Sequence, residues 1–152
     1  MSIDALQKKV FGYFEGDWSV KRRFEGSYTA VFDGLARFKA ESDAGVAYRY
    51  EEAGELNDGA GKQFNARQVY LYRLKASTIE VHKRDESDWT LMHELPFQMD
   101  GEDATSAHVH LCGKDYYSAV YRVNFMGGWV LRYAVTGPTK DYTIHSVYSR
   151  SS

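Results

Sequence analysis

Alternation of apolar and polar residues, with a period of two, runs through almost the whole chain from residue 16 to residue 150. At its start, Trp18 and Val20 alternate with charged or polar neighbours. Loop signals interrupt the alternation at hairpin spacing, most clearly at residues 57–61, which read Asn-Asp-Gly-Ala-Gly, and a further turn is expected at residues 42–45. Successive side chains of a strand point to opposite faces, so the pattern predicts about ten antiparallel strands joined by hairpins.

A sheet of this size is expected to close. An open sheet of about ten strands would leave two unpaired edges, so a barrel is the more economical arrangement. Barrels wider than about eight strands are not filled by side chains alone. The 12 tyrosines favour a partly wet face, because tyrosine suits strands and carries a polar tip. We therefore predict an all-β fold of one domain, residues 1–152: a single closed antiparallel up-and-down β-barrel with a ligand cavity.

One segment departs from the alternation. In residues 3–14, Leu6, Val10 and Phe14 recur at helical spacing on one stripe, and Asp4 can cap the first turn. This predicts a short N-terminal helix that plugs one end of the barrel.

Composition narrows the partners. The net charge of -2 and the pI near 6.2 provide no basic field for nucleic acid. No apolar stretch approaches the roughly 20 residues of a membrane span, and the N-terminus lacks a secretory signal. The one cysteine, Cys112, excludes an internal disulfide framework. We expect a cytoplasmic protein without nucleic-acid or membrane partners; the oligomeric state is not fixed by the sequence, which is compatible with a homodimer.

The two ends of the alternating region carry a family resemblance. Gly16-Asp17-Trp18 follows the expected helix, and Arg150 ends the last strand. In these features the chain resembles the calycin superfamily of ligand-binding barrels, which includes lipocalins and fatty-acid-binding proteins. The resemblance implies that Arg150 packs across Trp18 to close the barrel.

More of the chain is similar to an uncharacterised, mainly bacterial domain-of-unknown-function family within this barrel class. The matching segments are Trp18 with Arg22, residues 50–54, Tyr70, His93 with Leu95, residues 110–112, residues 115–117, residues 137–142 and Arg150. The resemblance implies a calycin-like fold with a shared polar interior, and it brings no established activity.

Strand parity places many polar side chains inside the barrel. Our candidate ligand-binding residues are Arg22, Tyr50, Glu52, Tyr70, His93, His110, Asp115, Tyr117 and Tyr133. Arg22 would neutralise an anionic group, Glu52 and His110 would fix hydrogen bonds, and the tyrosines would give shape and area. Buried charges need partners, so the same residues suit two hypotheses: a pocket for a polar, anionic or aromatic small molecule, or a structural network that fills the interior.

Two further chemistries remain open. His108, His110 and Cys112, with His93, contain metal-ligand types, but one strand cannot easily aim all three at one ion, so we expect no metal and no cofactor. His145 has outward parity, which argues against a haem ligand like that of the similar nitrobindin barrels. An enzyme would use His110 and Asp115 in acid–base chemistry, with Tyr117 or a Cys112 nucleophile.

Overall fold

The computed structural model describes residues 1–41 and 46–150, in which one helix precedes eleven strands. The turn expected at residues 42–45 lies outside the described residues. The elements are α1 (Ile3–Phe14), β1 (Gly16–Gly26), β2 (Ala30–Ala40), β3 (Ala47–Asp58), β4 (Gln63–Leu74), β5 (Ile79–Asp85), β6 (Asp88–Leu95), β7 (Gln98–Asp100), β8 (Asp103–Cys112), β9 (Asp115–Asn124), β10 (Gly128–Thr136) and β11 (Asp141–Arg150).

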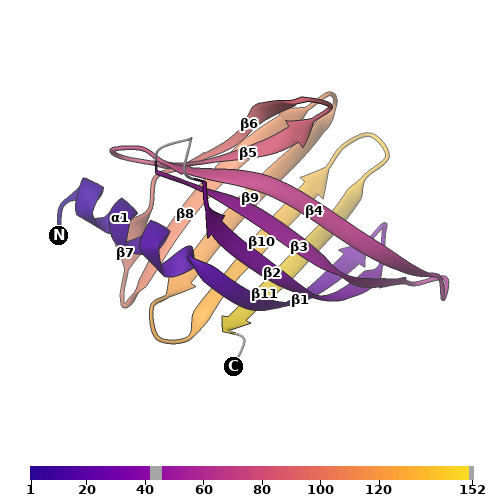
Figure 1. Cartoon of the computed structure of the whole chain (residues 1–152). Helices are drawn as coiled ribbons and strands as arrows, with labels where there is room; N and C mark the ends of the chain where they lie inside the picture. Colours follow the sequence, from indigo (N-terminus) through magenta and orange to yellow (C-terminus); the bar gives the residue numbers. More distant parts are fainter. Residues whose placement is uncertain (42–45, 151–152) are drawn as a thin grey trace.

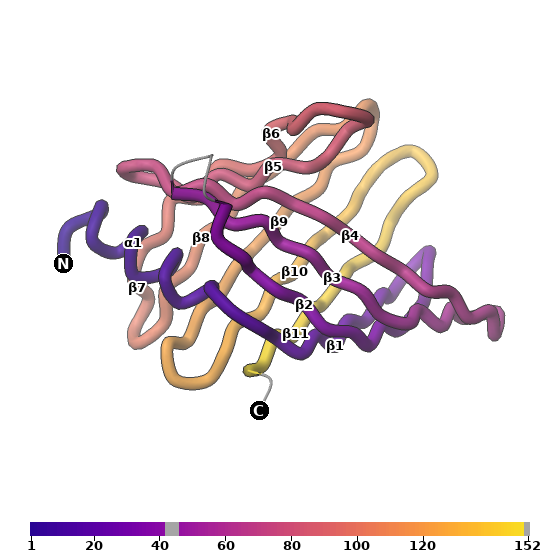
Figure 2. The backbone as a smooth tube through the Cα atoms, viewed as in Figure 1, coloured from indigo at the N-terminus to yellow at the C-terminus, as the bar shows by residue number. Residues whose placement is uncertain are grey.

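All eleven strands belong to one antiparallel sheet, in the order β6-β5-β4-β3-β2-β1-β11-β10-β9-β8-β7. The first and last strands are neighbours, with Trp18 opposite Arg150, so the two ends of the sheet lie in the middle of the chain. Figure 2 shows this adjacency of the indigo and yellow ends of the chain. The all-β, up-and-down prediction is confirmed. The eleventh strand, β7, has only three residues, too few for alternation to reveal it.

The sheet curls into a half-barrel, with β3 and β4 across from β9 and β10 (Figure 1). The described backbone ladder does not close it, because β6 pairs only with β5 and β7 pairs with just the first three residues of β8. Where β6 approaches β8, side chains bridge instead: His93 Nδ1 lies 3.0 Å from His108 Nδ1, and Ser106 Oγ donates to the Pro96 carbonyl at 3.0 Å. We call this approach the seam.

Helix α1 covers one end of the curled sheet, as predicted. Its cap differs: Ser2, not Asp4, accepts from the Ala5 amide at 3.1 Å, which leaves Asp4 in the first turn, where a negative charge is favoured. Gln7 anchors the helix, because its amide accepts from the Phe97 N–H and donates to the Phe97 carbonyl. No helix of the described residues has the length and apolar character that crossing a membrane requires.

Aromatic rings fill the end of the sheet beneath α1. Phe14 stacks on Phe38 with ring centroids 5.2 Å apart and packs against Trp129 at 4.9 Å. Arg150 lies over the Trp18 ring at 3.7 Å, as the calycin resemblance implied. Arg150 also donates to the Glu15 carbonyl at 2.9 Å. These contacts hold α1, β1 and β11 together at the end of the sheet that the aromatic rings fill.

A pair of glycines lets β2 and β3 approach closely. Gly34 and Gly54 are opposite each other, and the Phe32 ring lies against both from the same strand face. A methyl group on Gly34 would lie 2.6 Å from the Phe32 ring and 2.5 Å from the Ala53 carbonyl, so only glycine fits. The glycine in the middle of β2 therefore marks a close approach of backbone and ring.

Candidate functional site

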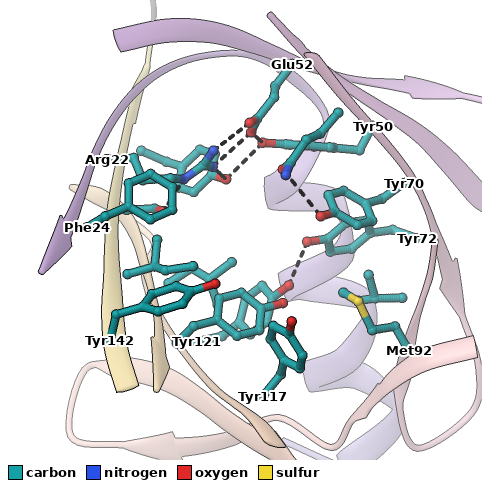
Figure 3. Close-up of a pocket in the computed structure, with 17 residues that line it drawn as sticks. Arg22, Phe24, Tyr50, Glu52, Tyr70, Tyr72, Met92, Tyr117, Tyr121 and Tyr142 are labelled. Carbon is teal, nitrogen blue, oxygen red and sulfur yellow. Dashed lines mark hydrogen bonds and ion pairs between the residues drawn. The ribbon is translucent and has the colours of Figure 1, made fainter. Parts of the chain in front are cut away.

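A cavity of about 270 Å³ lies inside the curled sheet, away from the aromatic end (Figure 3). Seventeen side chains line it, and eight of them are tyrosines. The lining residues are Arg22, Phe24, Tyr50, Glu52, Gln68, Tyr70, Tyr72, Val81, Met92, Tyr117, Tyr121, Leu131, Tyr133, Tyr142, Ile144, Ser146 and Tyr148. Only two of them, Arg22 and Glu52, carry a charge at neutral pH.

These two charges are paired with each other. Arg22 on β1 donates from both terminal nitrogens to the Glu52 carboxylate on β3, at 2.5 and 2.9 Å. The side chains are only 9% and 2% exposed, so the pair is shielded from solvent. Arg22 also donates to Ser146 Oγ at 2.7 Å and to the Tyr148 hydroxyl at 3.1 Å. The guanidinium thus uses four of its five N–H donors within the protein.

Tyrosine hydroxyls complete this network. Tyr50 donates to Glu52, and its oxygen lies 2.8 Å from the Tyr148 hydroxyl. Burial alone would lower the pKa of Arg22, but Tyr148 and the Glu52 carboxylate raise it above its ordinary value. The guanidinium therefore stays charged and the ion pair stays intact. Arg22 and Glu52 thus pair with each other, as the structural-network hypothesis requires, and the network lies to one side of the cavity without filling it.

Beside this network, β4 and β9 supply further tyrosine hydroxyls to the cavity. Tyr72 and Tyr121 bond to each other at 2.7 Å, and Tyr70 donates to Gln68 at 3.3 Å. Burial raises the pKa of Tyr70 to about 12 and raises that of Tyr72 and Tyr121 well above the usual value. Each group remains a hydroxyl that can both donate and accept a hydrogen bond.

The rim of the cavity holds a second ion pair. Lys140 lies 3.0 Å from the Asp115 carboxylate and donates to the Tyr117 hydroxyl at 3.3 Å. The hydrogen bond that Lys140 donates to the Asp115 carboxylate is the main cause that raises the pKa of Lys140. Tyr142 lines the cavity beside this group. The rim therefore presents tyrosine rings to a ligand, and the positive charge of Lys140 is already paired with the Asp115 carboxylate.

A row of three polar side chains connects the cavity to the seam. The Tyr133 hydroxyl lies 3.0 Å from Nε2 of His93, whose Nδ1 lies 3.0 Å from Nδ1 of His108. His93 is fully buried. Burial, and secondly the neighbouring His108 and His110, lower the pKa of His93 to about 3, so its imidazole is neutral.

Of the nine residues predicted to bind the ligand, six line the cavity: Arg22, Tyr50, Glu52, Tyr70, Tyr117 and Tyr133. His93, His110 and Asp115 do not. A bulge explains His93, because Val81 is opposite His93 and His82 is opposite Leu91, which leaves Met92 as an extra residue. Met92 takes the place on the cavity wall that strict alternation gave to His93, which lies behind it at the seam.

The other two misplaced residues belong to the β8–β9 hairpin. His110 is opposite Tyr117 of β9 and lies beyond the three β8 residues that pair with β7, with its ring 6.0 Å from that of His93. Asp115 is held at the rim by Lys140. Within residues 1–41 and 46–150, no hydrogen bond joins His110 to Asp115. The acid–base pair expected for an enzyme is therefore not assembled.

The remaining sequence candidates also lie outside the cavity. His108 contacts His93, whereas Cys112 is exposed and its sulfur lies 4.0 Å from Lys83 Nζ. In the described part of the chain, no three His, Cys, Asp or Glu residues are grouped to hold a metal ion. His145 accepts from Arg132 at 3.1 Å on the outer face, consistent with its outward parity.

Several cavity residues were not among the predicted binders. Tyr72 follows Tyr70 by two positions, so parity alone could have found it. Tyr121 has the parity of Tyr117 on β9, and Tyr142 and Tyr148 share one parity on β11, so alternation also places them on the cavity side. Met92 had no such signal, because only the bulge brings it to the wall.

Comparison with known proteins shows which fold and which family this chain shares. A solved structure titled as an S-type phycobiliprotein lyase, CPES, from Guillardia theta has 10% sequence identity and a TM-score of 0.63, with coverage of 100% of this chain and 99% of that one. This likeness shows that the two chains share a fold. A comparison with curated protein sequences gave no match. The model of a family of unknown function, DUF6314, matches residues 14–150. The chain belongs to this DUF6314 family.

Proposed function

We propose that the cavity binds a small, uncharged ring compound that carries one or more polar groups. The observation that carries this proposal is the mutual pairing of Arg22 and Glu52, because it leaves a tyrosine-rich cavity without a free charge. An anionic ligand would have to displace Glu52 from a buried bidentate ion pair, at a cost of several kcal/mol. From the sequence, Arg22 was expected to neutralise an anionic group of the ligand. We propose instead that Arg22 and Glu52 orient Tyr50 and Tyr148.

Size and wall chemistry restrict the ligand further. The volume of about 270 Å³ lies just below the range of small-molecule pockets, which span roughly 300–1,000 Å³. Leu131 and Ile144 give apolar contact, and the Tyr70, Tyr117 and Tyr133 hydroxyls can donate or accept. A compound of one or two rings with hydroxyl or carbonyl groups suits such walls.

We also propose that the sheet acts as a closed barrel around this ligand. The contacts His93–His108 and Ser106–Pro96 support closure, because they hold β6 against β8 through side chains where the described ladder has no backbone pairing. The similar structure is named a lyase, so an enzyme of this fold is the second candidate. The specific observation that favours it here is the contact between Tyr133 and buried His93.

The test uses a matched pair of variants on β11. Ile144 lines the cavity, whereas Val147 is 40% exposed on the outer face. Ile144→Trp should fill the cavity and abolish binding of phenol and indole, measured by NMR shifts of the cavity methyl groups. Val147→Trp should bind as the unmodified protein does. Native mass spectrometry of the purified protein would identify a tighter ligand carried from the cell. Equal binding of both probes by both variants would refute the cavity as the site.

A further inference from the structure

The row Tyr133–His93–His108 joins the cavity to the seam through a buried imidazole. The three side chains come from β10, β6 and β8, and both links measure 3.0 Å. Tyr133 lines the cavity, His93 is 0% exposed, and His108 is partly exposed at the unpaired edge of β8. One end of the row therefore meets the bound molecule, and the other end meets solvent.

A neutral imidazole in the middle of such a row can be arranged in two ways. It has one N–H donor and one bare nitrogen acceptor. In the first arrangement Tyr133 donates to Nε2 of His93, and Nδ1–H of His93 donates to His108. In the second, Nε2–H of His93 donates to Tyr133, and His108 donates to Nδ1 of His93. Both arrangements satisfy both hydrogen bonds, so neither tautomer is penalised.

We propose that Tyr133, His93 and His108 form a proton relay that exchanges an acidic hydrogen of the bound molecule with solvent. The ligand class is then a small ring compound with an acidic O–H or N–H, such as a phenol or an enol. This inference rests on the proposed binding function, because the relay serves the same cavity. It replaces the His110–Asp115 pair as the acid–base group, since neither of those side chains lines the cavity.

The proton balance is simple. The X–H bond of the ligand breaks as a new O–H bond forms on Tyr133, while the earlier Tyr133 proton moves to Nε2 of His93. The Nδ1 proton of His93 moves to Nδ1 of His108, and Nε2 of His108 releases its proton to water. The ligand is left with the electron pair of its X–H bond, and one proton has reached solvent. His93 carries no net charge before or after the transfer, which suits a site where burial opposes the charged form.

The other ionisable groups around the relay do not complete it. The His110 ring lies 6.0 Å from that of His93, and its buried Nε2 has no hydrogen-bond partner among the described residues. Lys83 lies towards His110 and contributes to lowering the pKa of His110. Burial and the neighbouring His108 and His110 disfavour a positive charge on His93, so they favour a neutral relay over a charged imidazolium.

The test measures hydrogen exchange of tyrosine hydroxyls in the ligand-free protein, by the deuterium isotope shift on tyrosine Cζ in NMR spectra. Tyr72 and Tyr121 are the internal control, because their hydroxyls bond to each other in the same cavity and are not connected to the histidines. The Tyr133 hydroxyl should exchange faster than theirs. His93→Gln should slow it by roughly a hundredfold, the loss typical of removing one proton-transfer group.

The glutamine variant separates the relay from a structural role. A glutamine amide can accept at its oxygen and donate at its nitrogen, so it can hold both neighbours, but it cannot pass a proton between its two ends. His108→Phe should also slow exchange at Tyr133. Equal exchange at Tyr72, Tyr121 and Tyr133, or an unchanged rate in His93→Gln, would overturn the relay. Because no ligand is used, failure to bind phenol would count against the proposed function alone.

Discussion

The two ends of the half-barrel follow the same alternation but are built from different chemistry. Beneath α1, Phe14, Trp18 and Phe38 are at most 1% exposed, and their rings contact one another or Trp129. At the other end the inward positions hold tyrosines and the Arg22–Glu52 pair around a cavity. The aromatic end is filled, because rings can pack on rings from every side. The cavity end stays open, because its polar groups turn towards one another.

Tyr148 marks the boundary between the two ends. Its ring stacks on Trp129 with centroids 3.6 Å apart, and its hydroxyl bonds to Tyr50 and accepts from Arg22. One side chain thus completes the dry core and begins the polar network. We therefore expect the aromatic end to contribute most of the stability, and the cavity end to be the one that holds the proposed ligand.

The largest effect is expected at the aromatic end. Phe14 is 0% exposed and its ring contacts Phe38, Tyr72, Phe97 and Trp129. Phe14→Ala should lower the free energy of unfolding by roughly 3–5 kcal/mol, the usual cost of removing a buried phenylalanine. Urea denaturation followed by tryptophan fluorescence measures this loss. A loss below about 1 kcal/mol would show that the helix is not part of the core.

The next effect tests the polar end. Glu52→Leu removes the partner of a buried guanidinium that keeps only Ser146 and Tyr148. We expect a loss of about 3 kcal/mol, at the lower end of the range for broken buried pairs. The double variant Arg22→Met with Glu52→Leu should recover most of that loss, because no charge is then left without a partner. A double variant as unstable as Glu52→Leu alone would contradict this explanation and show that the cost comes from packing.

The pH dependence of stability should come from the seam. His93 has a pKa of about 3 in the folded protein, against an ordinary value of 6.5. Folding therefore opposes its protonation: the stabilisation is complete above pH 6.5 and is lost as the pH falls towards 3. The free energy of unfolding should fall by about 2 kcal/mol between pH 7.5 and pH 5.

His93→Gln is the control for this prediction, because it removes the titrating group and keeps a donor and an acceptor. It should flatten most of the slope measured by urea denaturation at each pH. A smaller slope should remain, because the pKa of His110 is also lowered, chiefly by burial. If the slope is unchanged in His93→Gln, another group is responsible and His93 titrates normally.

The sequence was sufficient for what depends on alternation and insufficient for what depends on local exceptions to it. Period-two patterning identified the antiparallel sheet and the inward side of Arg22 and Glu52, and its interruption by helical spacing identified the helix at residues 3–14. It could not place His93, because a single extra residue on β6, Met92, changes which side chain reaches the cavity. Nor could it show that β6 and β8 meet through side chains, since backbone closure depends on how far the sheet curls.

The smallest expected effect gives the sharpest form of the comparison, because it uses the neighbour of Arg22. Lys21 is on the same strand but on the outer face, where it pairs with Asp33 at 2.5 Å, and both side chains are about two-thirds exposed, at 69% and 67%. Water already solvates both groups, so Lys21→Ala should change the free energy of unfolding by less than about 1 kcal/mol. Arg22→Ala, one residue away, should cost clearly more, because it leaves the Glu52 carboxylate buried with Tyr50 as its remaining donor. Urea denaturation of the two variants in parallel measures the difference. Equal losses would mean that solvent reaches the Arg22–Glu52 pair as freely as the Lys21–Asp33 pair. The proposal that the cavity binds an uncharged ligand would then no longer hold.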